Sequence, residues 1–241
     1  MKQSFLSLTV FLAFGILVLS GCVDDSDWCL RADGPIVTET LNLAEFNSIA
    51  LHMSARVELT QGEVQEVIFE GREDILDRLE LNVRNGVWDI DYDGCLRDVD
   101  SPTLFITVPE LEDVRVTGSG EIYSTNTFLV PEIDLSITGA GRIDMAVEVS
   151  ELDADISGSG EIFVEGSTLE LDVRISGSGD FRGFDCPTLT SDLRISGSGR
   201  IRTYTENELD ALISGSGDIL FKGNPELFVS ISGSGEVIDA N

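Results

Sequence analysis

The stretch Ile156-Ser-Gly-Ser-Gly-Glu-Ile162 decides the fold, because variants of it recur along the chain. The other six copies begin at Val116, Ile137, Ile175, Ile195, Ile213 and Ile231. Their starts are spaced by 21, 19, 19, 20, 18 and 18 residues. Near-constant spacing of this size is typical of proteins built from stacked repeats. We therefore expect each repeat to form one turn of a coil.

Inside a repeat, apolar or glycine residues alternate with polar ones, as in Leu152-Asp-Ala-Asp-Ile156. This period of two predicts a strand with one buried face. A repeat of about twenty residues cannot bury that face alone, and stacking with its neighbours in register solves the problem. We therefore predict an all-β fold, a right-handed parallel β-helix whose turns lie ~4.8 Å apart.

The two glycines of each repeat, such as Gly158 and Gly160, share the parity of the apolar residues, so we expect both on the inward face. The coil should be narrow or sharply bent there, because glycine has no side chain. A phosphate-binding loop is disfavoured, because no helix follows and no lysine lies nearby.

Two charged columns follow from the alignment of the repeats. The residue after the second glycine changes sign at four of six steps, which predicts an exposed ion ladder; the column is Glu121, Arg142, Glu161, Asp180, Arg200, Asp218 and Glu236.

The second column carries aspartate in six consecutive repeats and Phe228 in the seventh. Its carboxylates should repel one another at this spacing. Arg115, Arg174 and Arg194, two positions further on, are the expected counter-charges, and calcium is the alternative, because it prefers oxygen ligands. The candidate calcium column is Asp113, Asp134, Asp153, Asp172, Asp192 and Asp210.

Residues 1–21 are typical of a signal peptide, with Lys2 before an apolar run too short to span a membrane. The run ends in Leu19-Ser-Gly-Cys22, which resembles a bacterial lipobox and implies cleavage before Cys22 and its lipidation. A plain signal peptide is the alternative. Residues 22–35, which begin with several aspartates, are expected to form an acidic tether; this acidic start resembles the surface-export signal of Bacteroidetes lipoproteins.

The formal charge of −29 disfavours binding to nucleic acid or anionic lipid surfaces. Three cysteines besides Cys22 allow one internal disulfide, for which we favour Cys29–Cys95; Cys186 would remain a buried thiol. The single histidine, His52, and the absence of a CxxC pair argue against a zinc site.

Residues 36–110 are expected to be β-rich and less regular, as a cap or early turns of the coil that continues through residues 111–241. Residues 51–57 (LHMSARV) fit the repeat template. Gln61-Gly62 and Asn85-Gly86 predict hairpin turns. One short helical turn is expected at residues 73–79 and a strand at 104–108.

Four further motifs carry a resemblance to a known family. They are GPIVTET at residues 34–40, FNSI at 46–49, VELTQG at 57–62 and NGVW at 85–88. Together with the lipobox and the serial repeats, they are similar to the head GIN domain family of Bacteroidetes lipoproteins, described as putative auto-transporter adhesins. The resemblance implies a β-helical domain and an adhesive role, and it implies no catalytic residues.

The function expected is therefore a binding or structural lipoprotein of the cell envelope, held in the outer membrane by lipid and displayed at the surface or toward the periplasm. A glycan, another protein or a second copy of the chain would be its partner. The alternative is a polysaccharide-active lyase or glycosidase. The strictly periodic carboxylates disfavour that alternative, because an acid–base pair should interrupt the period at one place.

Overall fold

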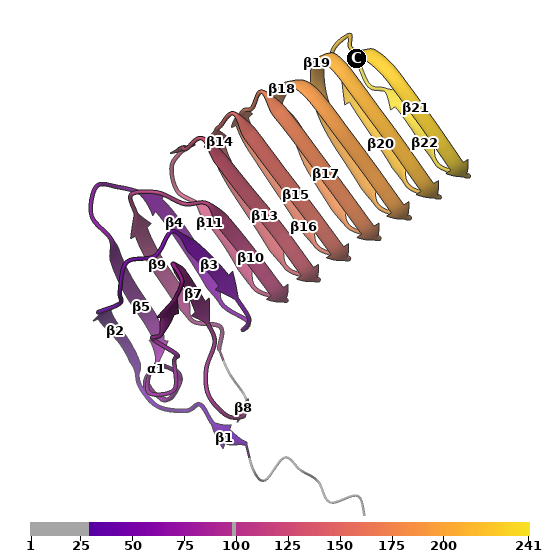
Figure 1. Cartoon of the computed structure of the whole chain (residues 1–241). Helices are drawn as coiled ribbons and strands as arrows, with labels where there is room; N and C mark the ends of the chain where they lie inside the picture. Colours follow the sequence, from indigo (N-terminus) through magenta and orange to yellow (C-terminus); the bar gives the residue numbers. More distant parts are fainter. Residues whose placement is uncertain (1–28, 98–99) are drawn as a thin grey trace, which may run out of the picture.

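The computed structural model describes residues 29–97 and 100–241 of the protein. These residues form a long β-solenoid, a stack of turns made of strands, with a cap at its N-terminal end (Figure 1). Each turn of the stack contributes one strand to each of two parallel layers, which we call the first stack and the second stack. The predicted β-solenoid is thus confirmed.

The first stack carries the residues that precede each Ser-Gly corner. Its strands are β10 (Asp113–Gly118), β13 (Glu132–Gly139), β15 (Glu151–Gly158), β17 (Glu170–Gly177), the second halves of β18 (Asp180–Gly197) and β19 (Arg200–Gly215), and β21 (Glu226–Gly233). Neighbouring strands are parallel and equivalent repeat positions pair, so Asp134 lies beside Asp153 and Gly139 beside Gly158. The predicted register is confirmed.

The second stack carries the residues that follow each corner. Its strands are β11 (Glu121–Ser124), β14 (Arg142–Glu148), β16 (Glu161–Ser167), the first halves of β18 and β19, β20 (Asp218–Lys222) and β22 (Glu236–Asp239). The short strand β12 (Phe128–Leu129) pairs with the end of β14.

The core lies between the two stacks. Ile156 of the first stack and Ile162 of the second are fully buried, as are their counterparts in most other turns. Each fully buried side chain of this kind stabilises the fold by roughly 1.5–3 kcal/mol relative to exposure. Because the apolar columns run through every turn, the core is one continuous cluster from the cap to the last turns.

The Ser-Gly corners need both glycines, for different reasons. Gly177 has a φ of 126°, and a Cβ there would lie 2.5 Å from the carbonyl oxygen of Gly158 in the preceding turn. That oxygen accepts a hydrogen bond from the Ser178 amide at 2.8 Å. The second glycine makes room for the core, because a Cβ on Gly160 would lie 2.5 Å from Ile137 Cγ2.

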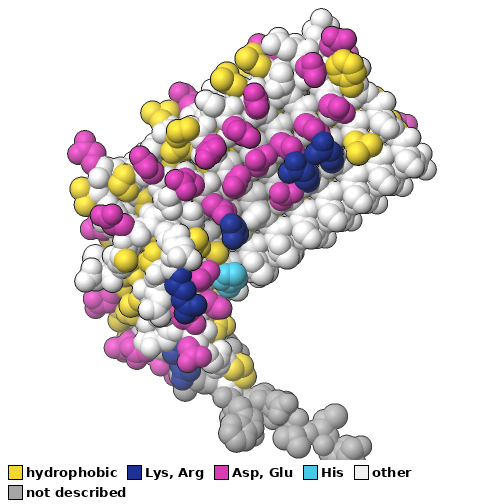
Figure 2. Space-filling model, viewed as in Figure 1, with side chains coloured by type: hydrophobic (Ala, Val, Ile, Leu, Met, Phe, Trp, Pro, Cys, Tyr) yellow, Lys and Arg dark blue, Asp and Glu magenta, His cyan; other side chains and the backbone are white. Residues whose placement is uncertain are grey.

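The expectation that both glycines face inward is therefore half wrong. Gly160 is buried, whereas Gly158 is partly exposed and sits in the bend itself. The period of two ends at the first glycine, because its positive φ turns the chain toward the other stack. In Figure 2 the edge where these corners lie is an almost uncharged ridge.

The opposite corners are less regular. The pairing register shifts between Gly183 and Pro187, where β18 accommodates extra residues. Buried hydroxyls satisfy the backbone at these corners: Thr168 Oγ1 donates to the Glu170 carbonyl at 2.8 Å, and Thr188 Oγ1 to the Thr190 carbonyl at 3.0 Å.

One further turn precedes the Ser-Gly repeats, as predicted. Strands β3 (Ser48–Leu51) and β4 (Arg56–Gln61) pair in parallel with β10 and β11. Met53 and Ala55, between them, are buried. His52 is exposed, and its Nε2 lies 3.4 Å from Asp89 Oδ1.

The cap closes the N-terminal end of the core. Its elements are β2 (Ile36–Leu41), β5 (Glu66–Arg72), α1 (Glu73–Leu76), β6 (Val83–Arg84), β7 (Val87–Ile90) and β9 (Thr103–Val108). Strands β7 and β9 pair in parallel with β3 and β4, and β2, β5 and β6 add antiparallel pairings outside them. Asn85-Gly86 forms the predicted hairpin turn between β6 and β7, with φ of 53° and 80°.

The hairpin predicted at Gln61-Gly62 is wrong. Strands β4 and β5 flank this turn but do not pair, because β9 lies between them and pairs with both. The helix predicted at residues 73–79 and the strand predicted at 104–108 are both present, the helix in a shorter form.

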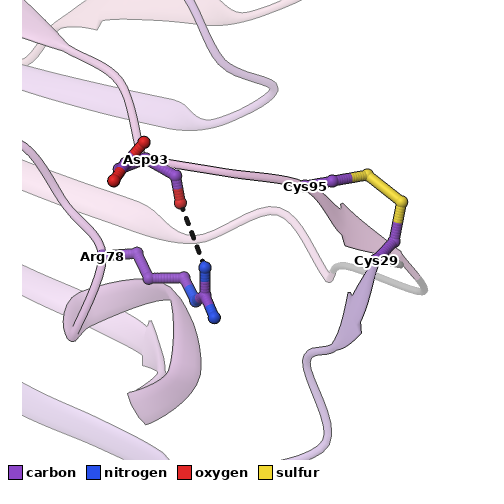
Figure 3. The surroundings of a disulfide bond; sticks show 4 residues. All are labelled: Cys29, Arg78, Asp93 and Cys95. Atoms are coloured by element: carbon purple, nitrogen blue, oxygen red, sulfur yellow. Dashed lines mark hydrogen bonds between the residues drawn. A yellow bond between two sulfur atoms is a disulfide. The ribbon is translucent and has the colours of Figure 1, made fainter. Parts of the chain in front are cut away.

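The first described residues are tied to the cap rather than free. Cys29 and Cys95 form a disulfide, and β1 (Leu30–Arg31) pairs with β8 (Leu96–Arg97) beside it (Figure 3). Nearby, Arg78 Nη1 donates to the Asp93 carbonyl at 3.3 Å. Residues 22–35 were expected to form a solvated tether; from Cys29 onward they are folded, and Ala32 is buried. Cys22 and residues 1–21 lie outside the described residues.

Among the described residues, no helix has the length and apolar character required to cross a membrane.

Candidate functional site

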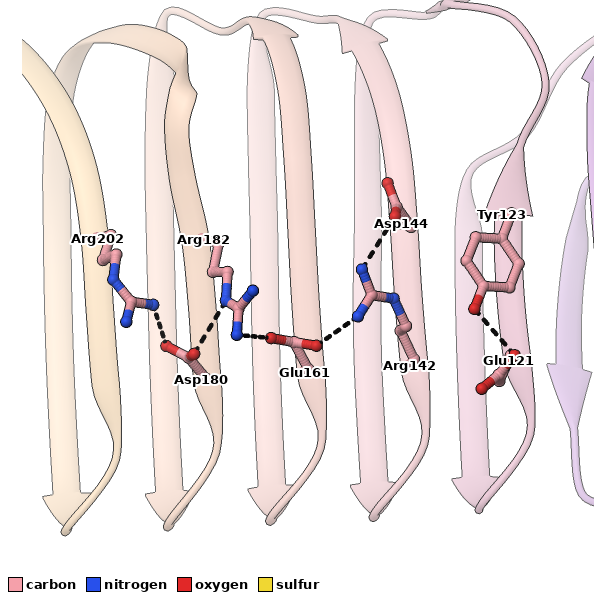
Figure 4. A network of polar contacts seen from close by, with 8 residues as sticks. All are labelled: Glu121, Tyr123, Arg142, Asp144, Glu161, Asp180, Arg182 and Arg202. Carbon is pink, nitrogen blue, oxygen red and sulfur yellow. Dashed lines mark hydrogen bonds and ion pairs between the residues drawn. The ribbon is translucent and has the colours of Figure 1, made fainter.

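The outer surface of the second stack is electrostatically balanced (Figure 4). Arg142 lies 2.5 Å from Glu161 and 3.2 Å from Asp144. Arg182 contacts both Glu161 and Asp180, and Arg202 lies 2.6 Å from Asp180. Within the predicted column, ion pairs form at two of the four opposite-charge steps, Arg142–Glu161 and Arg200–Asp218, so the predicted ladder is confirmed in part. Exposed pairs of this kind contribute at most about 1 kcal/mol each.

Two members of this ladder were missed from the sequence. Glu161 and Asp180 lie side by side on neighbouring strands, so two carboxylates meet there. Arg182 and Arg202 neutralise their charge; both belong to the neighbouring column, two residues further along each strand. The signal was the alternation of strand faces, which places residues i and i+2 on the same side.

The outer surface of the first stack is different, because carboxylates dominate it. The six aspartates predicted as one column do lie side by side on consecutive strands. A second acidic column runs beside them, with Glu132, Glu151 and Glu170 in register. Figure 2 shows acidic side chains gathered over these strands. We call this surface the acidic face.

Arginines offset part of this charge, as predicted. Arg174 lies 2.5 Å from Asp172, Arg194 lies 2.5 Å from Asp192, and Arg115 pairs with Asp113. In each pair the arginine follows its aspartate by two residues on the same strand. Asp134 has no such partner, because Ser136 occupies the equivalent position.

Repulsion and burial raise the pKa of carboxyls in this column. The pKa of Asp134 is raised by partial burial and by Asp153 and Asp113 on the neighbouring strands. The pKa of Asp172 is raised by burial, although Arg174 counteracts part of the effect. Asp172 Oδ1 is buried and accepts no hydrogen bond from the described residues. The acidic face is therefore short of positive charge.

Where the two acidic columns meet, they line a groove of about 290 Å³ across β15, β17, β18 and β19, which we call the acidic groove. No arginine or lysine lines it. Its lining residues are Glu151, Asp153, Glu170, Leu171, Asp172, Thr190, Ser191, Asp192, Glu208 and Asp210.

Calcium binding by the aspartate column stays a prediction. In the described ranges, residues 29–97 and 100–241, no three or more histidine, cysteine, aspartate or glutamate side chains are grouped so that they could hold a metal ion. The carboxylates lie in a row along the solenoid, which gives an extended charged surface rather than a compact cage.

Replacing Asp134 with asparagine is expected to stabilise the protein. The raised pKa means that the folded state binds a proton at Asp134 more tightly than the unfolded state does, so ionisation at pH 7 favours unfolding. Relief of a cross-strand repulsion of about 0.2–1 kcal/mol should raise the melting temperature by about 1–3 °C. Thermal unfolding followed by circular dichroism at pH 7 and low salt measures this change.

The gain should shrink as the pH falls and vanish at about pH 2, well below the ordinary aspartate pKa, where Asp134 is protonated in both states. It should also shrink in 1 M salt. Asp192→Asn is the matched control, because Asp192 is bonded to Arg194, and it should give no gain. Equal stabilisation by both variants would contradict the assignment.

Other reactive groups are remote from this surface or unreactive. Burial raises the pKa of the Cys186 thiol to about 12, so it stays protonated at neutral pH. The cap has its own cleft, of about 480 Å³, whose lining includes Glu45, Glu63 and Glu110 as well as Phe46 and Val64.

The cap brings together two motifs quoted from the sequence. The amides of Asn47 and Ser48 both donate to the Gly86 carbonyl, at 3.0 and 3.1 Å. The rings of Phe46 and Trp88 pack 5.6 Å apart, and Trp88 Nε1 donates to the Glu80 carbonyl at 2.9 Å. The fold and these contacts define the class of the molecule: a β-solenoid with a capped N-terminal end and an acidic face.

The chain belongs to the family described as "Putative auto-transporter adhesin, head GIN domain", whose model matches residues 45–225. The family expected from the sequence is thus confirmed. The comparison with curated proteins finds no match.

Solved structures share the fold over most of the chain. A putative adhesin from Bacteroides fragilis is 20% identical with a TM-score of 0.82, and the match covers 87% of this chain and 99% of that one. A putative lipid binding protein from Parabacteroides distasonis is 25% identical with a TM-score of 0.71 and the same coverage. A putative adhesin from Parabacteroides distasonis is 19% identical with a TM-score of 0.74, and covers 87% and 98%.

Proposed function

We propose that this protein is a binding module of the cell envelope that captures a positively charged protein surface on its acidic face. The observation that carries the proposal is the acidic groove, where seven carboxylates converge without a lysine or arginine in the lining. The second stack provides the contrast, because there Arg142, Arg182 and Arg202 pair with the carboxylates of Glu161 and Asp180.

A cationic ligand would relieve the repulsion between neighbouring aspartates, which together with burial raises the pKa of Asp134 and Asp172. Binding and deprotonation would then favour each other, because linkage between two equilibria is reciprocal. The large negative field would also speed the approach of a basic partner.

The relatives support a binding role. The family is described as adhesins, and the similar structures reported above are named as adhesins or as a lipid binding protein. None of them is named as an enzyme. Adhesion to a protein surface fits the acidic face better than adsorption to anionic lipid, which the charge of −29 would oppose.

We place the module at the outer membrane, anchored through lipid on Cys22 and displayed at the surface or toward the periplasm. Support comes from the signal sequence, the lipobox and the disulfide, a bond typical of oxidising compartments. The acidic residues after Cys22 would keep the solenoid away from the membrane.

Neutralising the groove is expected to weaken binding of a cationic probe. Isothermal titration of a decalysine peptide into the Asp153→Asn/Asp210→Asn double variant should give an affinity about tenfold lower than for the unmodified chain, because two groove charges are lost. The titration is made at 20 and 150 mM salt, where the wild-type affinity should fall with rising salt.

The control is Glu63→Gln/Glu66→Gln, which removes the same charge from the cap and should change the affinity less than about twofold. Equal loss in both double variants would show that only net charge matters. A neutral polysaccharide that binds more tightly than decalysine would also overturn the proposal.

A further inference from the structure

The two ends of the solenoid differ in how well their core residues and strand edges are covered. At the N-terminal end, the antiparallel strands β5 and β6 and helix α1 close the core, and Trp88 and Phe69 are completely buried there. At the other end, β21 and β22 form the last turn, and their outer edges pair with no strand among the described residues (Figure 1).

Core positions are exposed at that last turn. Leu227, Val229 and Ile231 occupy the columns of Leu209, Ala211 and Ile213. The three residues in the preceding turn are 0% exposed, whereas Leu227, Val229 and Ile231 are 43%, 47% and 43% exposed. The residues after β22 do not cover them, because Ala240 and Asn241 bond back to Phe221 and Gly223 in the preceding turn.

The last turn also loses the charges of the acidic face. Phe228 takes the place of aspartate in the column that all six preceding repeats fill with a carboxylate, and Ser230 takes the arginine position. Open strand edges in monomeric proteins are usually protected by charge. Here the edge strand β21 carries only one charged residue, Glu226.

We propose that β21 and β22 form the interface of a two-fold symmetric dimer, in which two solenoids join end to end. Rotation about an axis perpendicular to the sheets places β21 antiparallel to β21 of the second copy. Directly opposite residues of the two β21 strands point to the same side of the sheet, and side chains alternate along each strand. The odd-numbered core residues of one copy must therefore lie opposite odd-numbered residues of the other.

The central register of this kind pairs Val229 with itself, Leu227 with Ile231, Phe228 with Ser230 and Glu226 with Ser232. Along β21 no like charges face each other, so this strand does not add local repulsion to the contact. The dimer would cover the exposed core residues of both copies, as an isologous interface requires. It would place both acidic faces on one side of a doubled solenoid.

The test uses the chain from Val23 onward, which contains every described residue. Sedimentation velocity at 100 µM should give twice the monomer mass for this chain and the monomer mass for Val229→Lys. Leu169→Lys is the matched control, because Leu169 is 51% exposed at a corner away from β21, and it should remain dimeric. Circular dichroism checks that both variants are folded.

A second measurement tests the register. Val229→Cys should form an intermolecular disulfide on mild oxidation, because the two copies of residue 229 meet at the axis. Leu169→Cys should stay monomeric on a non-reducing gel. A monomeric wild-type chain at 100 µM, a dimer that survives Val229→Lys, or cross-linking of Leu169→Cys but not Val229→Cys would each overturn the proposal.

Discussion

Replacement of Gly177 with alanine is expected to lower the free energy of unfolding by about 3 kcal/mol or more. Gly177 lies at a Ser-Gly corner in the middle of the solenoid, with a φ of 126° that residues with a Cβ rarely adopt. The added Cβ would also lie 2.5 Å from the Gly158 carbonyl oxygen. This oxygen belongs to rigid backbone and accepts the hydrogen bond that holds adjacent corners together.

Urea unfolding of Gly177→Ala, followed by circular dichroism, measures the loss. Ser176→Ala is the matched control, because Ser176 is exposed on the preceding position and should change stability by less than about 0.5 kcal/mol. Equal effects of the two substitutions would show that the corner does not require a glycine.

Cys22→Ser is expected to move the protein from the membrane fraction to the soluble fraction almost completely. The lipid on Cys22 is the only membrane attachment that we propose, and stable anchoring needs the acyl chains that this cysteine would carry. Fractionation of cells followed by immunoblotting measures the distribution.

Cys29→Ser is the control for loss of a cysteine near the N-terminus. It removes the disulfide to Cys95 but leaves Cys22, so the protein should stay with the membrane. A Cys22→Ser protein that remains in the membrane fraction would contradict lipid anchoring through this residue.

The solenoid could be predicted in detail because its information is local and repeated. Each Ser-Gly segment has the same alternation of residues, and the alignment of the seven copies predicts that Gly158 pairs with Gly139 and Gly177, as the structure shows. The cap could not be predicted in this way. Its strands have no repeated counterparts in the sequence. Strand β9 lies between β4 and β5 although Thr103, its first residue, is 36 residues after Val67 of β5 in the sequence.

The candidate site was foreseen in part. The aspartate column and its arginine partners follow from the repeat alignment, and both are present. The acidic groove was not foreseen, because it depends on how the glutamates of one column and the aspartates of the next line a common hollow. The buried Thr168 and Thr188 were also missed, since the irregular corners that need their hydroxyls have no repeated signature.

The claim on which the rest depends is that distant repeats build one continuous binding surface. Backbone NMR of the chain from Val23 onward, titrated with decalysine, tests it most directly. We expect the shifts to concentrate at Asp153, Asp172, Asp192 and Asp210, four positions far apart in sequence that are neighbours only if the turns stack. Shifts confined to the cap cleft around Glu45 and Glu63, or spread evenly over all carboxylates, would contradict the account.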